Sequence, residues 1–286
     1  MMPPKSGTWS FSASLTGTKF HIEHIADDEP ENPQPYWHVQ DLVVSELGIT
    51  AARGVGANLG IDAFLPLRLV RDRVHYLDLA REPYAPPNPG LHHRNETLTG
   101  IADPQLGLTY GRALSSWTVV ARAALSIPVG RTEANPFELG RLGKWHQHIQ
   151  FGTGTWDPVL GFGVGRAAGP VNLNLDGVAR VSLSENEHGY RAGGRYSLFL
   201  NGSPALGGGW IAGAGFRLSH EEAEKWDGEI EEEGNLGRTD LFLSLGGGRM
   251  ISAFGAVTAN AEISLASKTT GHQVDIPIIL SLQWNH

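Results

Sequence analysis

The chain has 286 residues, a net charge of -8 at pH 7, no cysteine and a mean hydropathy of -0.19. The negative charge argues against nucleic acid as the main partner, because phosphate contacts need clustered Lys and Arg. No stretch approaches the roughly 18 consecutive apolar residues of a membrane helix. The alternating strands of a membrane β-barrel remain compatible with this composition, because their hydropathy averages to a neutral value.

Segments that alternate apolar and small polar residues recur along the whole chain. In the first, Thr8 to Thr16 (TWSFSASLT), Trp9, Phe11 and Leu15 share one face and the serines share the other. This period of two is typical of a β-strand with unlike faces. About twelve such strands are predicted, near residues 8–16, 37–52, 59–69, 100–111, 117–129, 155–164, 171–183, 190–200, 210–218, 239–245, 257–265 and 276–284.

The connections between these strands alternate between long polar loops and short Gly-rich turns. This rhythm is typical of an up-and-down antiparallel barrel and gives no support to a Greek-key sandwich. We therefore expect an all-β fold in which residues 1–286 form one transmembrane β-barrel domain, after a tail at 1–7, with both termini periplasmic. Long extracellular loops are expected near 17–36, 71–97, 130–152 and 219–237.

The N-terminal stretch MMPPKSG carries no apolar signal region. An exported form would have lost or replaced its signal peptide. The C-terminal Trp284 is followed by Asn285 and His286, whereas membrane barrels usually end on an aromatic residue.

Aromatic residues test the membrane hypothesis, because a membrane barrel places them in belts at the two lipid interfaces. Most Trp and Tyr residues on the apolar face fall at strand ends, with Tyr196 as the exception. The predicted lipid-interface aromatics are Trp9, Tyr110, Trp117, Trp210 and Trp284 at the short-turn rim, and Trp37, Trp156 and Tyr190 at the long-loop rim.

Charged residues recur on the opposite face of the predicted strands, where they need water or partners. About twelve strands enclose a lumen too wide to be filled by small apolar side chains, so we place the charged face inside. The predicted residues of the lumen and solute path are Asp62, Arg68, Arg122, Asp176, Arg180, Arg191, Arg195, Arg217, Asp240, Glu262 and Asp275.

The order of these charges permits two interpretations. A basic arc on strands five and seven to nine, facing an acidic arc on strands ten to twelve, would set a transverse field across a narrow water-filled path. Alternatively, facing charges pair off as structural ion pairs.

Several stretches resemble one family. GIADPQLGLTYG at 100–111, LSIPVGR at 125–131 and GTGTWDPVLGFGVG at 152–165 are similar, in this order, to the MetA-pathway phenol-degradation family of outer-membrane β-barrel proteins. The strand GANLGIDAFLPLRLV and the closing VDIPIILSLQWNH also resemble its pattern. The resemblance covers the chain from about Val39 to its end and implies a transporter of small, often hydrophobic, compounds.

No catalytic signature is present: there is no GxSxG elbow, and GFGVGR at 161–166 precedes a turn and a strand where a phosphate-binding loop needs a helix. The histidine pairs His21/His24, His92/His93 and His146/His148 lack a third ligand in sequence. Runs of Asp and Glu near 23–31 and 221–233 are typical of solvated loops. We expect no catalytic residue, no metal and no cofactor, and we interpret the protein as a non-enzyme.

The sequence thus predicts a porin-like transport channel in the outer membrane of a Gram-negative bacterium. Its solutes would be small molecules, hydrophobic or aromatic compounds among them, and its membrane partners would be outer-membrane lipid and lipopolysaccharide. One alternative is a structural barrel with an occupied lumen that anchors or sheathes a periplasmic protein partner, and a third, less favoured, is a membrane-embedded hydrolase.

Overall fold

The computed structural model describes residues 2–26, 34–87, 94–251, 254–271 and 274–286. Among them, no helix is long and apolar enough to cross a bilayer.

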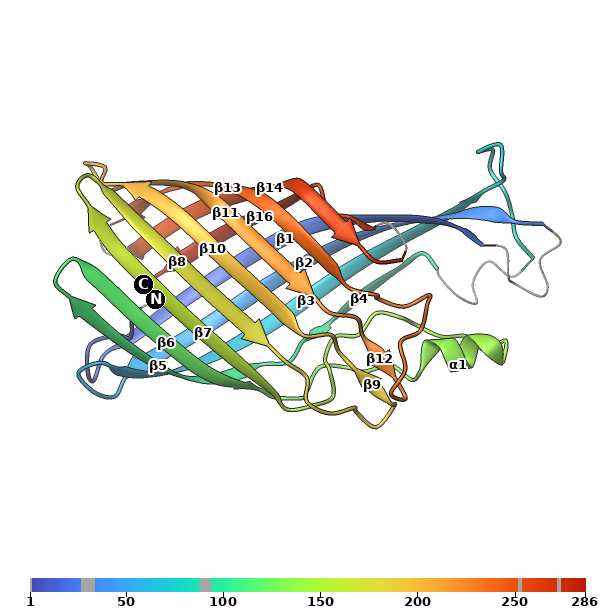
Figure 1. The fold of residues 1–286 in the computed structure, drawn as a ribbon, viewed down its shortest axis with the longest axis horizontal. Coiled ribbons are helices and arrows are strands. Elements are labelled where there is room, and N and C mark those ends of the chain that lie inside the picture. The colour runs from blue at the N-terminus through green and yellow to red at the C-terminus, as the bar shows by residue number, and fades with distance from the viewer. Residues whose placement is uncertain (1, 27–33, 88–93, 252–253, 272–273) are drawn as a thin grey trace.

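Twelve long antiparallel strands form one closed sheet, which confirms the predicted barrel (Figure 1). Neighbours in the chain are neighbours in the sheet, and β1 pairs with both β2 and β16, so the barrel has no free edge. The twelve are β1 (Trp9–Ala26), β2 (Tyr36–Gly54), β3 (Leu59–Leu77), β5 (Gln105–Leu114), β6 (Trp117–Ser126), β7 (Asp157–Ala168), β8 (Val171–Arg180), β10 (Arg195–Pro204), β11 (Trp210–Glu221), β13 (Arg238–Ile251), β14 (Gly255–Thr269) and β16 (Ile278–Asn285).

Two short strands extend the wall beyond the twelve. β4 (Glu96–Ile101) pairs with β3 above β5, and β15 (Val274–Asp275) pairs with β1 above β16. In both places a proline, Pro104 or Pro277, follows the short strand, and it removes an N–H that the ladder would need.

The short turns and both termini lie at one end of the barrel, as the alternating rhythm predicts (Figure 1). The backbone of Phe11 exchanges hydrogen bonds with His286, at 2.9 and 2.8 Å, and Gly7 N donates to Gly54 O at 2.8 Å. These bonds hold the two chain ends to the same rim, which we call the short-turn end.

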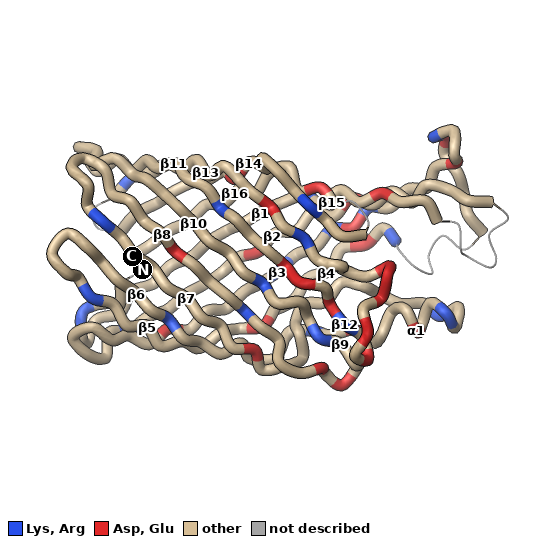
Figure 2. The backbone as a smooth tube through the Cα atoms, viewed as in Figure 1, with Lys and Arg blue, Asp and Glu red and all other residues tan. Residues whose placement is uncertain are grey.

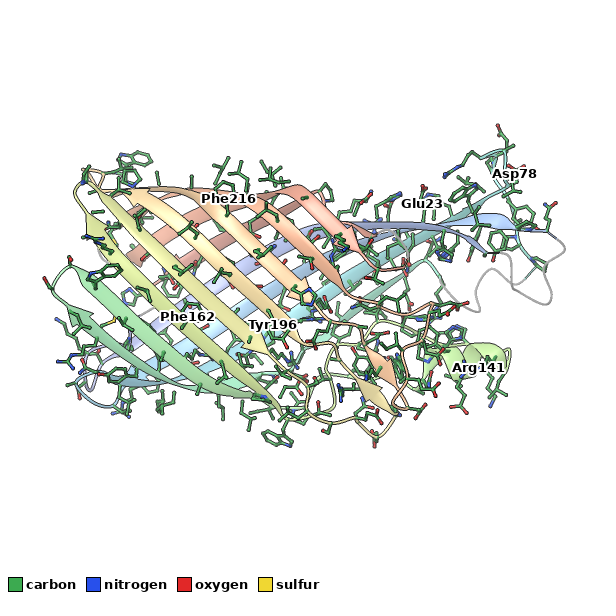
Figure 3. All side chains as sticks on the ribbon, in the orientation of Figure 1. Glu23, Asp78, Arg141, Phe162, Tyr196 and Phe216 are labelled. Atoms are coloured by element: carbon green, nitrogen blue, oxygen red, sulfur yellow. The ribbon has the colours of Figure 1, made fainter. Side chains whose placement is uncertain are left out.

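The apolar face of the strands points outward. On β1, Trp9 and Leu15 are more than half exposed, and Phe11 lies between them on the same face. Phe216 on β11 points away from the barrel (Figure 3). In an antiparallel barrel this exposed face is the one that meets lipid.

Three strands continue well past this apolar band, where the sequence predicted loops at 17–36 and 71–97. β1 runs to Ala26 and β3 to Leu77. On β3 the polarity of the two faces is exchanged after Leu69. The apolar Val70 and Val74 point inward, while Arg71 and Arg73 lie on the outer face. The outer face of this extension meets water. A strand whose end is predicted from the end of its apolar face is therefore predicted too short.

A small cap of loops lies at the opposite, long-loop end (Figure 1). It contains α1 (Pro136–Arg141), β9 (Tyr190–Arg191) and β12 (Lys225–Trp226), packed around Phe137, Tyr190 and Trp226. The Asn135 side chain caps α1 by accepting from the N–H groups of Phe137 and Glu138.

Two sequence predictions are wrong in this cap. Tyr190 is buried against Trp226, with ring centroids 4.7 Å apart, and so is not a lipid-interface residue. Arg191 lies on the separate β9–β12 ladder and so is not on the lumen wall. Both belong to a two-residue strand that the sequence pattern merged with β10.

We predict that Leu65→Arg on β3 lowers the free energy of unfolding by about 2–4 kcal/mol, because a charge enters the middle of the lipid-facing band. His75→Arg, on the same face of β3 but beyond the band, should cost less than about 1 kcal/mol. Denaturant titration in phospholipid vesicles measures both values. Equal costs at the two positions would contradict the proposed limit of the band.

Candidate functional site

The candidate site is the lumen, and most of its charged side chains form ion pairs with each other. Arg68 binds Glu46 at 2.8 Å, and Arg195 binds Glu221 at 2.9 Å. The remaining pairs on the strands, with their N–O distances, are Arg122–Asp62 at 2.6 Å, Arg217–Glu262 at 2.7 Å, Arg238–Asp240 at 2.7 Å and Arg180–Asp157 at 2.7 Å.

The Asp62–Arg122 ion pair joins β3 to β6 across the strand that lies between them, β5. Asp62 is on β3 and Arg122 on β6, and the bridge passes over Gly107 of β5. A Cβ at Gly107 would lie 2.7 Å from the carboxylate and 2.9 Å from the guanidinium. Glycine at this position therefore makes the bridge sterically possible.

Arg217 and Glu262 form an equivalent bridge on the other side of the barrel. Arg217 on β11 reaches across β13 to Glu262 on β14, and its guanidinium lies 4.3 Å from the ring centroid of Phe242. Phe242 is 1% exposed, although its strand position faces the lumen. The pair and the ring together fill this part of the interior.

A buried network joins the β6–β7 loop to the wall near the long-loop end. Arg180 donates to Asp103 at 3.0 Å and to Asp157 at 3.0 and 2.7 Å, and both carboxylates are fully buried. Asp103 also accepts from the N–H groups of Gly130, at 2.9 Å, and Thr153, at 2.8 Å.

This network explains the three quoted motifs. Asp103 comes from GIADPQLGLTYG, Gly130 from LSIPVGR, and Thr153, Thr155 and Asp157 from GTGTWDPVLGFGVG. The Thr155 hydroxyl donates to Asp157 at 2.6 Å. Stretches far apart in the chain therefore meet in one set of hydrogen bonds.

The interpretation of separate basic and acidic arcs is wrong. Arg180, Arg195 and Arg217 each hold a carboxylate, so the alternative of structural ion pairs describes the wall. Asp275 is exposed and pairs in register with His21 on the outer face of β1, so it does not face the lumen. Asp176 faces the lumen on β8.

The sequence did not identify the partners of these arginines. Glu46 lies in a predicted strand and Glu221 in a predicted loop. Arg238 lies two residues before Asp240 on the same face of its strand. Recurring opposite charges on inward positions of adjacent strands are the signal that points to them.

Near the short-turn end the lumen side chains lie flat against the wall. The Oδ1 atoms of Asp176 and Asn174 rest over Gly163 and Gly165 of β7, 2.6 and 2.8 Å from where a Cβ would be. Asn201 rests in the same way over Gly215. The glycines thereby keep these polar groups at the wall and leave space inside.

An open cavity of about 380 Å³ lies at this end, beside Ser10 and Ser12 of β1. The segment Met2–Pro4 borders it and also packs on β3, since a Cβ at Gly60 would lie 2.9 Å from Pro3. The serine face of TWSFSASLT thus borders free space.

The aromatic residues of the short-turn rim are paired with arginines that the sequence reading overlooked. Arg53, Arg166 and Arg249 lie over Trp9, Trp117 and Trp210, respectively, at 5.5, 4.9 and 5.3 Å from the ring centroids. Each pair is cross-strand in register. Such pairs give lipid headgroups a cation beside an indole.

The other predicted belt residues occupy varied positions. Tyr110 and Trp156 are exposed, and Trp284 donates through Nε1 to Phe254 O at 2.6 Å. Trp37 lies on the strand extension, with the Arg81 guanidinium 3.7 Å from its ring centroid.

The inner face of the strand extension carries a buried polar cluster. Gln40 Nε2 donates to Asp72 at 2.8 Å, and both side chains are buried. The pKa of Asp72 is raised to about 6, mainly by burial; the hydrogen bond from Gln40 opposes this rise and the neighbouring Glu96 carboxylate adds to it. Asp72 lies beyond the apolar band.

The predicted histidine pairs do not form a metal centre in the part of the chain that the structure describes. His21 contacts Asp41 at 2.9 Å, while His24 points to the other side of β1 and lies against His38. His146 and His148 pack edge to face. His92 and His93 lie outside the described residues. No group of three His, Cys, Asp or Glu within the described ranges could hold a metal.

A closed barrel with an apolar outer band and a polar inner wall is a transmembrane β-barrel. The solved structure of the COG4313 outer membrane channel from Pseudomonas putida is similar, with a TM-score of 0.60 and 12% identity, covering 99% of this chain and 96% of that one. The toluene transporter TodX of Pseudomonas putida matches with a TM-score of 0.50 and 10% identity, covering 98% and 90%.

A mutant of TodX, described as a monoaromatic hydrocarbon channel, matches with a TM-score of 0.51 and 10% identity, covering 99% of this chain and 90% of that one. At these identities the likeness shows the fold, which is that of outer-membrane channels. No family model and no curated protein matches the chain.

We predict that Arg180→Met destabilises the barrel by about 3–5 kcal/mol, because it leaves two buried carboxylates without their cation. Arg166→Met, which removes an exposed arginine over Trp117, should cost less than about 1 kcal/mol. Urea unfolding in detergent, followed by the change in gel mobility of the folded barrel, provides the comparison. A loss under about 1 kcal/mol for Arg180→Met would show that the network does not secure the loop.

We predict that Asp72 makes the protein less stable as pH rises from about 4 to about 6. The unfolded carboxyl ionises near its ordinary pKa of 3.8, whereas the folded one stays protonated up to about 6. Asp72→Asn removes this penalty, so its stability relative to the native protein should increase over that window. Urea midpoints between pH 4 and 8 test this, with the exposed Glu82→Gln as control, and a difference independent of pH would contradict it.

Proposed function

We propose that the protein is a bacterial outer-membrane channel for small molecules. The observation that carries the proposal is the closed twelve-stranded barrel in which most lumen charges cancel in pairs while the outer band is apolar. A lumen of this kind can hold water and solute without a net cost of unpaired buried charge.

The proposed orientation places the short turns and both termini in the periplasm and the long loops outside the cell. Short periplasmic turns and longer external loops are the usual arrangement of such barrels. Acidic residues concentrate in the loops around β9 and β12 (Figure 2), where water is available to solvate them. Outer-membrane lipid and lipopolysaccharide would then surround the outer band.

Hydrophobic and aromatic compounds are the proposed solutes. Two similar structures are those of the toluene transporter TodX and of its mutant, a monoaromatic hydrocarbon channel. The resemblance of three motifs to the MetA-pathway phenol-degradation family supports the same class. The hydrogen bonds of Arg180 to Asp103 and Asp157 hold the β6–β7 loop to the wall at the long-loop end.

Planar-bilayer conductance tests the channel proposal. The purified barrel should show heat-modifiable gel mobility and discrete conductance steps. The double variant Asp62→Ala/Arg122→Ala should conduct more than the native protein, because it removes a neutral pair from the lumen and leaves no charge unpaired.

Leu65→Ala, which trims a side chain on the outer face of the same strand, is the matched control and should leave conductance unchanged. Absence of any conductance in native and double-variant protein, together with no uptake of toluene by protein-containing vesicles, would overturn the channel function.

A further inference from the structure

Asp176 differs from the other lumen carboxylates of the wall. Asp62, Glu46 and Glu262 each bind an arginine. Within the described part of the chain, no ion pair or hydrogen bond joins the Asp176 side chain to another residue. Since the paired charges cancel, Asp176 supplies an uncompensated negative charge to the part of the lumen toward the short-turn end.

The position of the Asp176 carboxylate follows from its strand neighbours. Asp176 pairs with Gly163 on one side and Phe199 on the other. Its Oδ1 lies over Gly163, 2.6 Å from where a Cβ would be, so the missing side chain creates the place that the carboxylate occupies. It is half-buried and reachable from the lumen.

No cation of the wall is placed to neutralise Asp176. Arg217 belongs to the same row of the sheet, but Phe199 stands between them and Arg217 is held by Glu262. Arg122, two strands away, is held by Asp62. Both nearby arginines are therefore already committed.

The groups beside Asp176 add further oxygen atoms. Asn174 lies two residues away on the same face of β8, and Asn201 faces the lumen on β10. Their Oδ1 atoms lie against Gly165 and Gly215, so each amide, like the carboxylate, is laid along the wall. This arc offers hydrogen-bond acceptors and one negative charge to a passing solute.

We propose that Asp176 and its amide neighbours form a cation-binding station in the lumen, which makes the path selective for small cations and amine-bearing solutes over anions. Carboxylates that line a pore select cations in this way. This inference rests on the proposed channel function and names its preferred charge class. Uncharged aromatic solutes would pass the station without penalty.

The first test is the reversal potential of the reconstituted protein in a potassium chloride gradient. At low ionic strength, a unit charge about 5 Å from the path in water-like surroundings raises the local concentration of potassium about fourfold and lowers that of chloride about fourfold, so potassium is favoured over chloride about 16-fold. Asp176→Asn should bring the permeability ratio close to one. Asp62→Asn frees Arg122 and should shift the ratio toward chloride, whereas Asp275→Asn, on the outer face, should leave it unchanged.

The second test does not need conductance and uses the absence of native cysteine. Asn174→Cys places a thiol beside Asp176. In detergent-solubilised protein, a trimethylammonium thiosulfonate should label this thiol several-fold faster than a sulfonate of the same length, relative to their rates with free thiol. Adding Asp176→Asn should abolish the preference.

These outcomes separate the two proposals. A charge preference in labelling without conductance would support the cation station and overturn the channel function. A native permeability ratio near one, a ratio unaffected by Asp176→Asn, equal labelling rates, or a thiol that neither reagent reaches would each overturn the station.

Discussion

The structure depends on one constraint: in lipid, every backbone N–H and C=O of a spanning segment must find its partner inside the protein. The pairing of β1 with both β2 and β16 meets it by removing the sheet edges. Once the sheet closes, each strand has one face toward lipid and one toward the lumen, and a one-residue slip would exchange them. The strict alternation of TWSFSASLT is the result.

Closure of the sheet also affects the inner face, where side chains from many strands compete for a narrow space. Glycines settle this competition: Gly107 admits the Asp62–Arg122 bridge, and Gly163 receives Asp176. The 37 glycines are thus partly a steric complement to the polar lumen. The conformational cost of glycine in a strand is offset by the packing of the neighbouring side chain.

The sequence was sufficient to predict the strands of the barrel wall and their two faces, but not the contacts between side chains on the inner face. Alternation separated the two faces of each strand, because periodicity is local, and the aromatic belt together with the charged face then assigned Trp9 to the outside and Arg122 to the inside. The pairing of Arg122 with Asp62 depends on the register between strands 60 residues apart, which periodicity does not contain. Tyr190 was misplaced because its apolar side chain serves a small loop core, and one strand pattern cannot distinguish that core from lipid.

The two ends of the lumen follow different physical rules. At the long-loop end, Asp103 and Asp157 are fully buried, so their charges must be matched by Arg180 and by hydrogen bonds. Toward the short-turn end an open cavity lies beside Ser10 and Ser12, and on β8 Asp176 is only half-buried, so water can solvate its lone carboxylate at little cost. Asp176 can therefore line the lumen without an ion-pair partner, and its field acts on whatever occupies the space that the glycines leave.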